Sequence, residues 1–283
     1  MSGEKTTPKR PRKSEAGRGR NSPQDCQALN ASLNRTWSEL WPTIEPFVSP
    51  SAAPTPAMCR TLRTRLTHFS PHHVDEPEHL SAICVALVKA RYLLGAALDW
   101  HCPSIGSKPS AAAIARGDQW RLVMGWSGCE VLVLTLCRVP KRGGKSPSGG
   151  MSPAEIDAAI SPLHLPAFAP VCPPKRKLKS LEIWLDQGTR VNRQEILEFL
   201  GMKNGDANIM DSWLVHGRRT ETWEESMKLA KAIRNASAHG ALSATKVREW
   251  GLRPACGQLL ADLATVVTAI LGSWPETGAS QDE

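Results

Sequence analysis

Residues 230–250, "AKAIRNASAHGALSATKVREW", end an amphipathic helix with an arginine, an asparagine and a histidine. On a helix that turns about 100° per residue from Trp223, one side carries the apolar residues Met227, Leu229, Ala230 and Ile233. Arg234 falls within that apolar arc, whereas Asn235 and His239 fall on the opposite, polar side. Burying a cation is costly unless an acid pairs with it, so we expect a carboxylate from another helix beside Arg234.

Two acids fit that requirement, because each is the only charge in a long apolar run: Glu130 in "VMGWSGCEVLVLTLC" and Asp262 in "QLLADLATVVTAIL". Glu130 is the preferred partner, since it shares a helical stripe with Trp126, Val133 and Cys137. A purely structural alternative stays open. In that reading the pair only fixes helix register, and His239 belongs to an ordinary helix end.

Helical periodicity extends outward from this stretch in both directions. We expect helices from Pro23 to about Pro42, through "AMCRTLRTRLTHF", over 76–100, 112–137 and 222–239, after Ser243, and over 254–274. Shorter helices are expected in "LEIWLDQ", "RQEILEFLG" and "ANIMDSWLV". No segment alternates as a strand would. The sequence therefore predicts an all-α bundle.

The expected organisation has five parts. A disordered basic tail covers residues 1–21, a helical extension covers 22–75, and a four-helix core covers 76–138 and 220–274. Residues 139–219, rich in Pro, Gly and Lys at their start, form an insertion between the two halves of the core, and 275–283 form a second disordered tail.

The net charge of +8 is concentrated at the N-terminus, where the first twenty residues hold seven Lys or Arg and two Glu. Such a tail attracts phosphates electrostatically. Two readings remain: a solubilising tail, or an arm that contacts RNA through Lys9, Arg10, Arg12 and Lys13. Basic clusters at 141–145 and 175–179 are a further candidate for an RNA path, although charged runs usually form solvated faces.

The eight cysteines show no C-x-x-C pair, which favours free thiols in a reducing compartment. Charges interrupt the apolar runs, and no apolar segment follows the basic N-terminus as in a signal peptide. We therefore expect a soluble cytoplasmic protein with no membrane contact. The cluster "HFSPHHVDEPEH", residues 68–79, matches no zinc spacing and is expected to be a solvated loop, so no metal or other cofactor is predicted.

The helix order and the motif together resemble the HEPN ribonuclease superfamily. Two long helices, the second with an acid in "GWSGCE", precede an insertion, and "IRNASAHG" closes the third long helix. The family motif is an Arg, commonly followed by a polar residue, with a His four to six positions later. The resemblance covers 76–138 and 220–274, and assigns Arg234, Asn235 and His239 to the active site, with Glu130 as supporting acid. A second match, Arg63 to His68, lacks both the polar second residue and the following long helix.

The resemblance implies a metal-independent endoribonuclease that acts as a homodimer with its motifs face to face. RNA supplies the 2′-hydroxyl as nucleophile, His239 exchanges protons near neutral pH, and Arg234 and Asn235 contact the phosphate. A toxin or antiviral defence effector, restrained by a regulatory protein partner, belongs to the same reading. The alternative is a non-catalytic helical module that binds RNA or a protein.

Overall fold

The computed structural model describes residues 23–49, 53–67, 77–101, 108–138, 150–174, 204–240 and 242–273. Within these ranges the protein is helical and contains no strand, which confirms the all-α prediction. The elements are α1 (Pro23–Val48), α2 (Pro56–Thr67), α3 (Pro77–Leu98), α4 (Ala111–Cys137), α5 (Pro153–Ile160), α8 (Asn204–Met210), the π-helical turn η1 (Asp211–Val215), α9 (Trp223–Ala238), α10 (Ala244–Glu249) and α11 (Arg253–Gly272).

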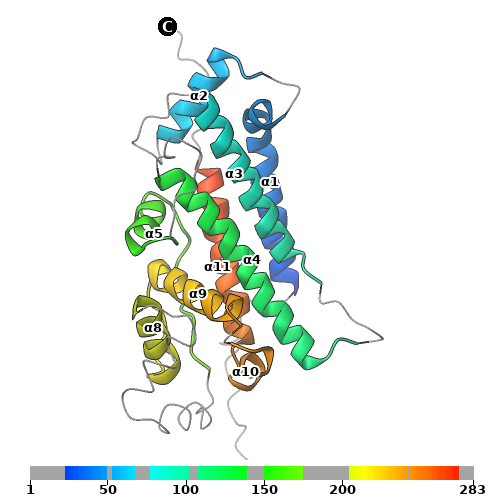
Figure 1. Cartoon of the computed structure of the whole chain (residues 1–283), viewed down its shortest axis with the longest axis vertical. Helices are drawn as coiled ribbons and strands as arrows, with labels where there is room; N and C mark the ends of the chain where they lie inside the picture. Colours follow the sequence, from blue (N-terminus) through cyan, green and yellow to red (C-terminus); the bar gives the residue numbers. More distant parts are fainter. Residues whose placement is uncertain are drawn as a thin grey trace, which may run out of the picture.

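Among the described helices, α1, α3, α4 and α11 are long and run along the long axis, with α4 packed between α3 and α11, and α1 packed on α3 and α11 (Figure 1). One hydrophobic core joins them. Its members include Leu33 of α1, Leu87 of α3, Trp126 of α4 and Leu263 of α11, all fully buried. The segment expected as an N-terminal extension therefore contributes to the same core as the predicted four-helix unit.

The first helix is longer than the sequence predicts. It continues through Pro42 and Pro46 to Val48 instead of ending near Pro42. An internal proline removes a helical hydrogen bond and is normally disruptive. Here the additional turns bury Ile44 and Phe47 in the core, and this burial compensates for the lost bond.

Two glycines in α4 allow its neighbours to approach closely. A Cβ added at Gly128 would lie 2.8 Å from the backbone oxygen of Ala90 in α3, and one at Gly125 would lie 2.5 Å from a methyl group of Leu260 in α11. The "GWSGCE" stretch, which carries Glu130, is therefore held between two helices at short range.

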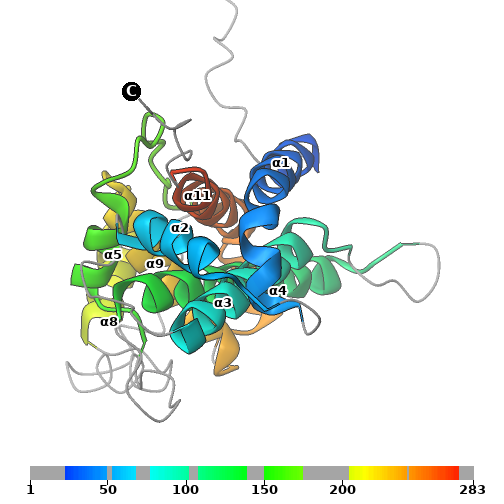
Figure 2. The ribbon, with the colours of Figure 1, turned by 90° about the horizontal axis from the view of Figure 1, so that it is seen from above.

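The helix α9 crosses one side of α4 and α11, and is flanked by α5 and α8 (Figures 1 and 2). Thr222 caps its start by accepting a bond from the Glu225 amide. Gly240, with φ of 73°, ends the helix in the left-handed region that glycine tolerates best. Ser243 then caps α10 as predicted.

In the part of the chain that the structure describes, three helices are apolar enough, by length and composition alone, to cross a membrane: residues 79–98 of α3, and the whole of α4 and α11. All three contribute buried residues to the hydrophobic core. The cytoplasmic location and the absence of membrane contact stay predictions.

All seven described cysteines are free, and four of them, Cys59, Cys84, Cys129 and Cys256, are buried. Burial raises the pKa of Cys84, Cys129 and Cys256 to about 12. These thiols are therefore protonated at neutral pH and serve as small apolar groups in the core.

We expect Gly128→Ala to lower the free energy of unfolding by about 1–3 kcal/mol, because the α3 backbone must move to admit the methyl group. Gly95→Ala in α3 is the matched control, since no atom lies within 4 Å of the added Cβ. That change should raise stability by up to about 1 kcal/mol through helix propensity. Urea unfolding measures both. Equal effects of the two substitutions would contradict the close approach of α3 and α4.

Candidate functional site on α9

The structure brings Arg234 and Glu130 together. Arg234 Nη2 lies 3.6 Å from Glu130 Oε2, and the two side chains are 26% and 17% exposed. Asp262, the other acid considered from sequence, instead accepts a hydrogen bond from the Ser226 hydroxyl at the opposite end of α9. The ion pair therefore joins the middle of the apolar run in α4 to the C-terminal half of α9.

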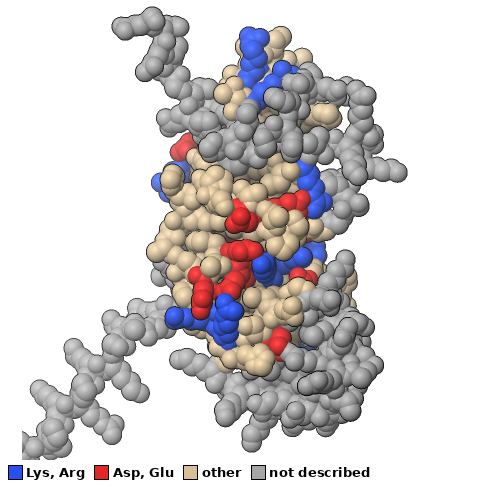
Figure 3. Space-filling view, turned by 90° about the vertical axis from the view of Figure 1, so that its left-hand side faces the viewer, with Lys and Arg blue, Asp and Glu red and all other residues tan. Residues whose placement is uncertain are grey.

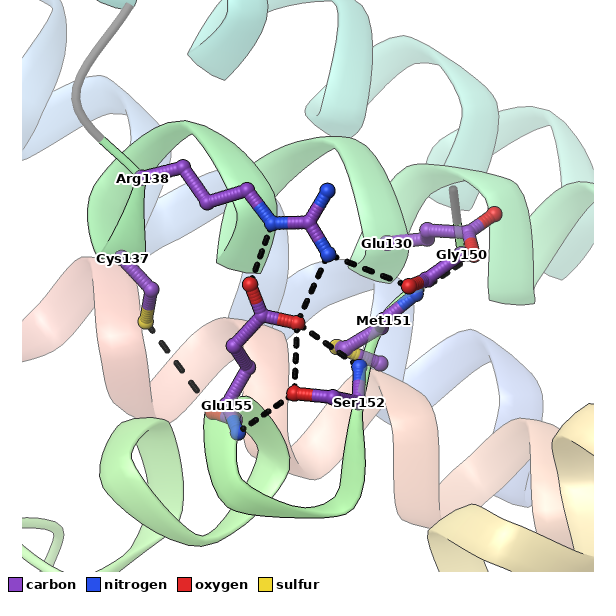
Figure 4. Close-up of polar contacts among 7 residues, drawn as sticks. All are labelled: Glu130, Cys137, Arg138, Gly150, Met151, Ser152 and Glu155. Carbon is purple, nitrogen blue, oxygen red and sulfur yellow. Dashed lines mark hydrogen bonds and ion pairs between the residues drawn. The ribbon is translucent and has the colours of Figure 1, made fainter. Parts of the chain in front are cut away.

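Glu130 is held from a third direction by the chain that leads into α5. The Met151 backbone N–H donates to Glu130 Oε1 at 3.3 Å, and Gly150 lies beside the same carboxylate (Figure 4). Met151 is itself fully buried. The carboxylate thus joins α4, α9 and the start of the 150–174 segment.

Asn235 belongs to the same hydrogen-bond network as Arg234. This corrects the expectation that Arg234 and Asn235 lie on opposite sides of the helix without contact. Arg234 Nη1 donates to Asn235 Oδ1 at 2.8 Å, and Asn235 Nδ2 donates to Asp206 Oδ2 at 2.8 Å. Asn235 is partly buried. The physical reason is that α8 packs on the polar side of α9, so that side meets protein as well as solvent.

Asp206 and Lys231 complete the network and were not singled out from sequence. Asp206 is 7% exposed, and its other oxygen lies 3.6 Å from the Lys231 ammonium. Lys231 precedes Asn235 by one helical turn, and this spacing was the available signal for it. Asp206 lies in the first turn of α8, inside the predicted insertion, and its contact with α9 is a long-range one that no local pattern indicates.

His239 stands apart from the other motif residues. It is the C-cap of α9, its side chain is exposed, and within the described part of the chain that side chain has no hydrogen-bond or ion-pair partner. Its backbone N–H bonds to the Asn235 carbonyl at 3.0 Å, so its position is fixed by the end of the helix. Among the described residues, one chain therefore joins Arg234, Asn235 and Glu130, and the His239 side chain lies outside their network.

Arg234 and His239 can contribute different chemistry, because their contacts differ. Arg234 keeps donors beyond those used by Glu130 and Asn235, because a guanidinium carries five N–H groups. An imidazole can act as a general acid or base when a substrate lies within hydrogen-bond reach of it. The site can thus offer fixed positive charge at one point and proton transfer at another.

A second polar cluster fastens the C-terminal end of α4 to the N-terminal end of α5. Arg138 makes a double contact with Glu155, through Nε and through Nη2 at 2.9 Å, and Nη2 also donates to the Gly150 carbonyl at 3.1 Å (Figure 4). Glu155 and Ser152 form a capping box at the start of α5. This cluster fixes the chain whose Met151 N–H holds Glu130.

The candidate RNA-contacting residues Lys9, Arg10, Arg12 and Lys13, and the basic clusters at 141–145 and 175–179, lie outside the described residues. Most of the His-rich segment, predicted to be a solvated loop, lies outside them too. The helices expected in "LEIWLDQ" and "RQEILEFLG", and the tail 275–283, lie outside them as well. Among the residues that are described, no group of three or more His, Cys, Asp or Glu is arranged to hold a metal ion.

The Arg138 cluster predicts a pH dependence of stability. The hydrogen bond from Arg138 and the bonds from Ser152 lower the pKa of Glu155 from 4.5 to about 2, against the effect of burial. A lowered pKa stabilises the folded state above about pH 4.5, and this contribution is lost as the pH falls towards about 2. We expect Glu155→Gln to be less stable than the wild type at neutral pH, with the difference closing across that interval.

Urea unfolding at a series of pH values measures this difference. Asp157→Asn is the control, because Asp157 lies exposed on the same helix and its only described side-chain contact is with Ser161. A stability difference for Glu155→Gln that is independent of pH would contradict the ionic role of Glu155.

The sequence was also compared with known families and proteins. No family model matches it, and neither a curated protein nor a solved structure matches it. The resemblance to the HEPN superfamily therefore rests on the α9 motif and the order of the long helices.

Proposed function

We propose that the protein has a HEPN-like fold and is a metal-independent endoribonuclease that acts as a homodimer. The observation that carries the proposal is the C-terminal half of α9, where an exposed His239 follows an Arg234–Asn235 pair held by Glu130 and Asp206. An arginine fixed by a carboxylate and an amide is preorganised, so little conformational freedom is lost when a phosphate binds.

The reaction needs only proton transfer and charge stabilisation. The 2′-oxygen of the RNA loses its proton to His239 and forms a bond to the adjacent phosphorus, while the bond from phosphorus to the 5′-oxygen of the next nucleotide breaks. The leaving oxygen takes a proton from an imidazolium. Arg234 stabilises the negative charge that develops on the non-bridging oxygens. The products carry a 2′,3′-cyclic phosphate and a 5′-hydroxyl, and no metal or cofactor is required.

A dimer supplies the geometry that one straight helix lacks. Arg234 and His239 are five residues apart and diverge by about 140° around the helix axis. In an isologous dimer the same surface of both subunits meets at the two-fold axis, so His239 of one subunit can face the Arg234 of the other. The surface exposure of His239 and its lack of a partner among the described residues support this arrangement.

The mechanism predicts cleavage of labelled RNA by the purified protein in EDTA, with 2′,3′-cyclic phosphate ends. His239→Ala should lower the rate by about 100-fold or more, the usual effect of removing a general acid–base group. Because His239 is exposed, folding should be unaffected. His164→Ala, an exposed histidine in the segment after α5, is the matched control and should cleave normally. Full activity of the His239 variant, or a requirement for a divalent ion, would exclude the mechanism.

A mixing experiment tests the shared cleft. Arg234→Lys and His239→Ala should each be inactive alone, because each removes one half of the site. If the halves come from different subunits, mixed dimers regain one intact pairing, and an equimolar mixture should recover about a quarter of the wild-type rate. A site built within one chain would give no recovery. Light scattering on the same samples reports the subunit number.

The second candidate function is a non-catalytic helical module that binds RNA or a protein. It is favoured by a specific observation: Arg234 and Asn235 are both engaged by neighbours in the same chain, as expected of residues that hold helices together. In that case the wild type should bind RNA without cutting it, and His239→Ala should bind equally well. A toxin or defence role, a restraining protein partner, and RNA contacts by the basic N-terminal residues are parts of the primary proposal.

A further inference from the structure

A cavity of about 470 Å³ opens between α5, α8 and α9, next to the network around Asn235. Its volume falls in the range of small-molecule sites in proteins, about 300–1,000 Å³. The walls come from the start of α5, from the chain between Gly205 and Arg218 that includes α8 and η1, and from the part of α9 between Glu225 and Lys231. The start of α5 is distant in sequence from the other two. The cavity therefore depends on the tertiary fold.

The cavity shares three residues with the site on α9. Asp206 and Lys231 line it and also belong to the Asn235 network, and Met151 lines it while its N–H holds Glu130. A ligand in the cavity therefore lies beside Asp206, and Asp206 in turn accepts a hydrogen bond from Asn235 of the Arg234–Asn235 pair. Neither the motif nor the family resemblance assigns a role to this cavity.

The walls of the cavity differ in chemistry. One part is apolar, formed by Met151, Pro153, Ile156 and Ile209. Met151 and Ile156 are almost completely buried, so this part of the wall is well fixed. Such a surface suits a flat, weakly polar group such as a nucleobase, whose faces lose water on contact with apolar side chains.

The charged part of the lining has donors to spare, whereas its acids are engaged. Three cations, Arg218, Lys228 and Lys231, face two acids, Asp206 and Glu225. Both oxygens of each acid already have a partner: Lys231 and Asn235 for Asp206, Arg218 and the Glu221 N–H for Glu225.

Each lysine ammonium carries three donors and has one ion pair among the described residues. Donors therefore remain for an anion, and the cavity lining carries one net positive charge by this count of three cations and two acids.

We infer that this cavity binds a nucleoside phosphate, with the base against the apolar wall and the phosphate at Lys228 and Lys231. The nucleotide comes either from a single-stranded RNA or from a free mononucleotide. That the bound nucleotide belongs to an RNA cut at α9 rests on the proposed function. The face over α5, α8 and α9 carries Lys and Arg interspersed with Asp and Glu (Figure 3), so binding depends on the cavity and not on a broad basic surface.

Gly205 allows the cavity to be filled with little disturbance to the fold. It lines the cavity in the first turn of α8, and a Cβ added there meets no atom of the described residues within 4 Å. Gly205→Trp should therefore fold and occupy the space. Gly95→Trp is the matched control, because Gly95 also has no atom within 4 Å of an added Cβ but lies on α3, away from the cavity.

The experiment measures binding by calorimetry and fluorescence anisotropy. The probes are adenosine 3′-monophosphate and a labelled single-stranded decamer of 2′-O-methyl RNA, which lacks the nucleophile and is not cleaved. We expect Gly205→Trp to weaken binding of at least one probe by about tenfold or more, and Gly95→Trp to leave it unchanged. Lys228→Gln should weaken binding by a similar factor, with Lys89→Gln, an exposed lysine of α3, as its control.

The two probes identify the source of the nucleotide and separate this inference from the proposed function. Loss of decamer binding alone indicates an RNA subsite, and loss of mononucleotide binding alone indicates a free nucleotide. Cleavage that needs His239, together with unchanged binding in Gly205→Trp, overturns the inference and leaves the proposed function intact. Absence of cleavage, together with weakened binding in Gly205→Trp, overturns the proposed function and leaves the inference of a nucleotide-binding cavity intact. Binding of neither probe by the wild type also overturns it.

Discussion

The ion pair between Arg234 and Glu130 is the contact on which the arrangement around α9 depends. Glu130 is the acid that interrupts the apolar run of α4, and close approach at Gly125 and Gly128 fixes that run between α3 and α11. Each partner then holds a further group, Met151 on one side and Asn235 on the other. Removing either charge would leave the other partly buried without its partner, which is unfavourable, although solvent access makes the cost smaller than for a fully buried pair.

Local sequence patterns were sufficient to predict most of the described helices and the pairing of Arg234 with Glu130 in the candidate site. The apolar stripe of α9 identified Arg234 as a cation that needs an acid, and the stripe of α4 pointed to Glu130. The same reasoning failed where the outcome depends on distant packing. It ended α1 at Pro42, because the burial of Ile44 and Phe47 is not a local property. It assigned Asn235 to an outer polar face, because no sequence pattern indicates that α8 covers that face.

The predicted insertion therefore has a larger structural part than its composition suggested. Its described residues supply the Met151 N–H that holds Glu130, the Asp206 carboxylate that holds Asn235, and two of the three walls of the cavity. The Arg138–Glu155 contact anchors its first helix to the end of α4. Pro, Gly and Lys content predicts a loop-rich insertion, but composition does not reveal that its described residues pack against the Arg234 network on other helices.

The structural alternative and the proposed chemistry differ in the part that they give to His239. A network that only stabilises the fold needs Glu130, Arg234, Asn235 and Asp206, and gains nothing from an exposed imidazole beyond the helix end. A phosphate-cleaving site needs that imidazole close to a guanidinium, and a single α9 turns the two apart. Both requirements are met if the network preorganises Arg234 within each chain and a two-fold axis brings in the histidine of a second chain. The same residues then have two effects: within each chain they hold the helices together, and only in the dimer do they meet a second chain's histidine and cleave a phosphate.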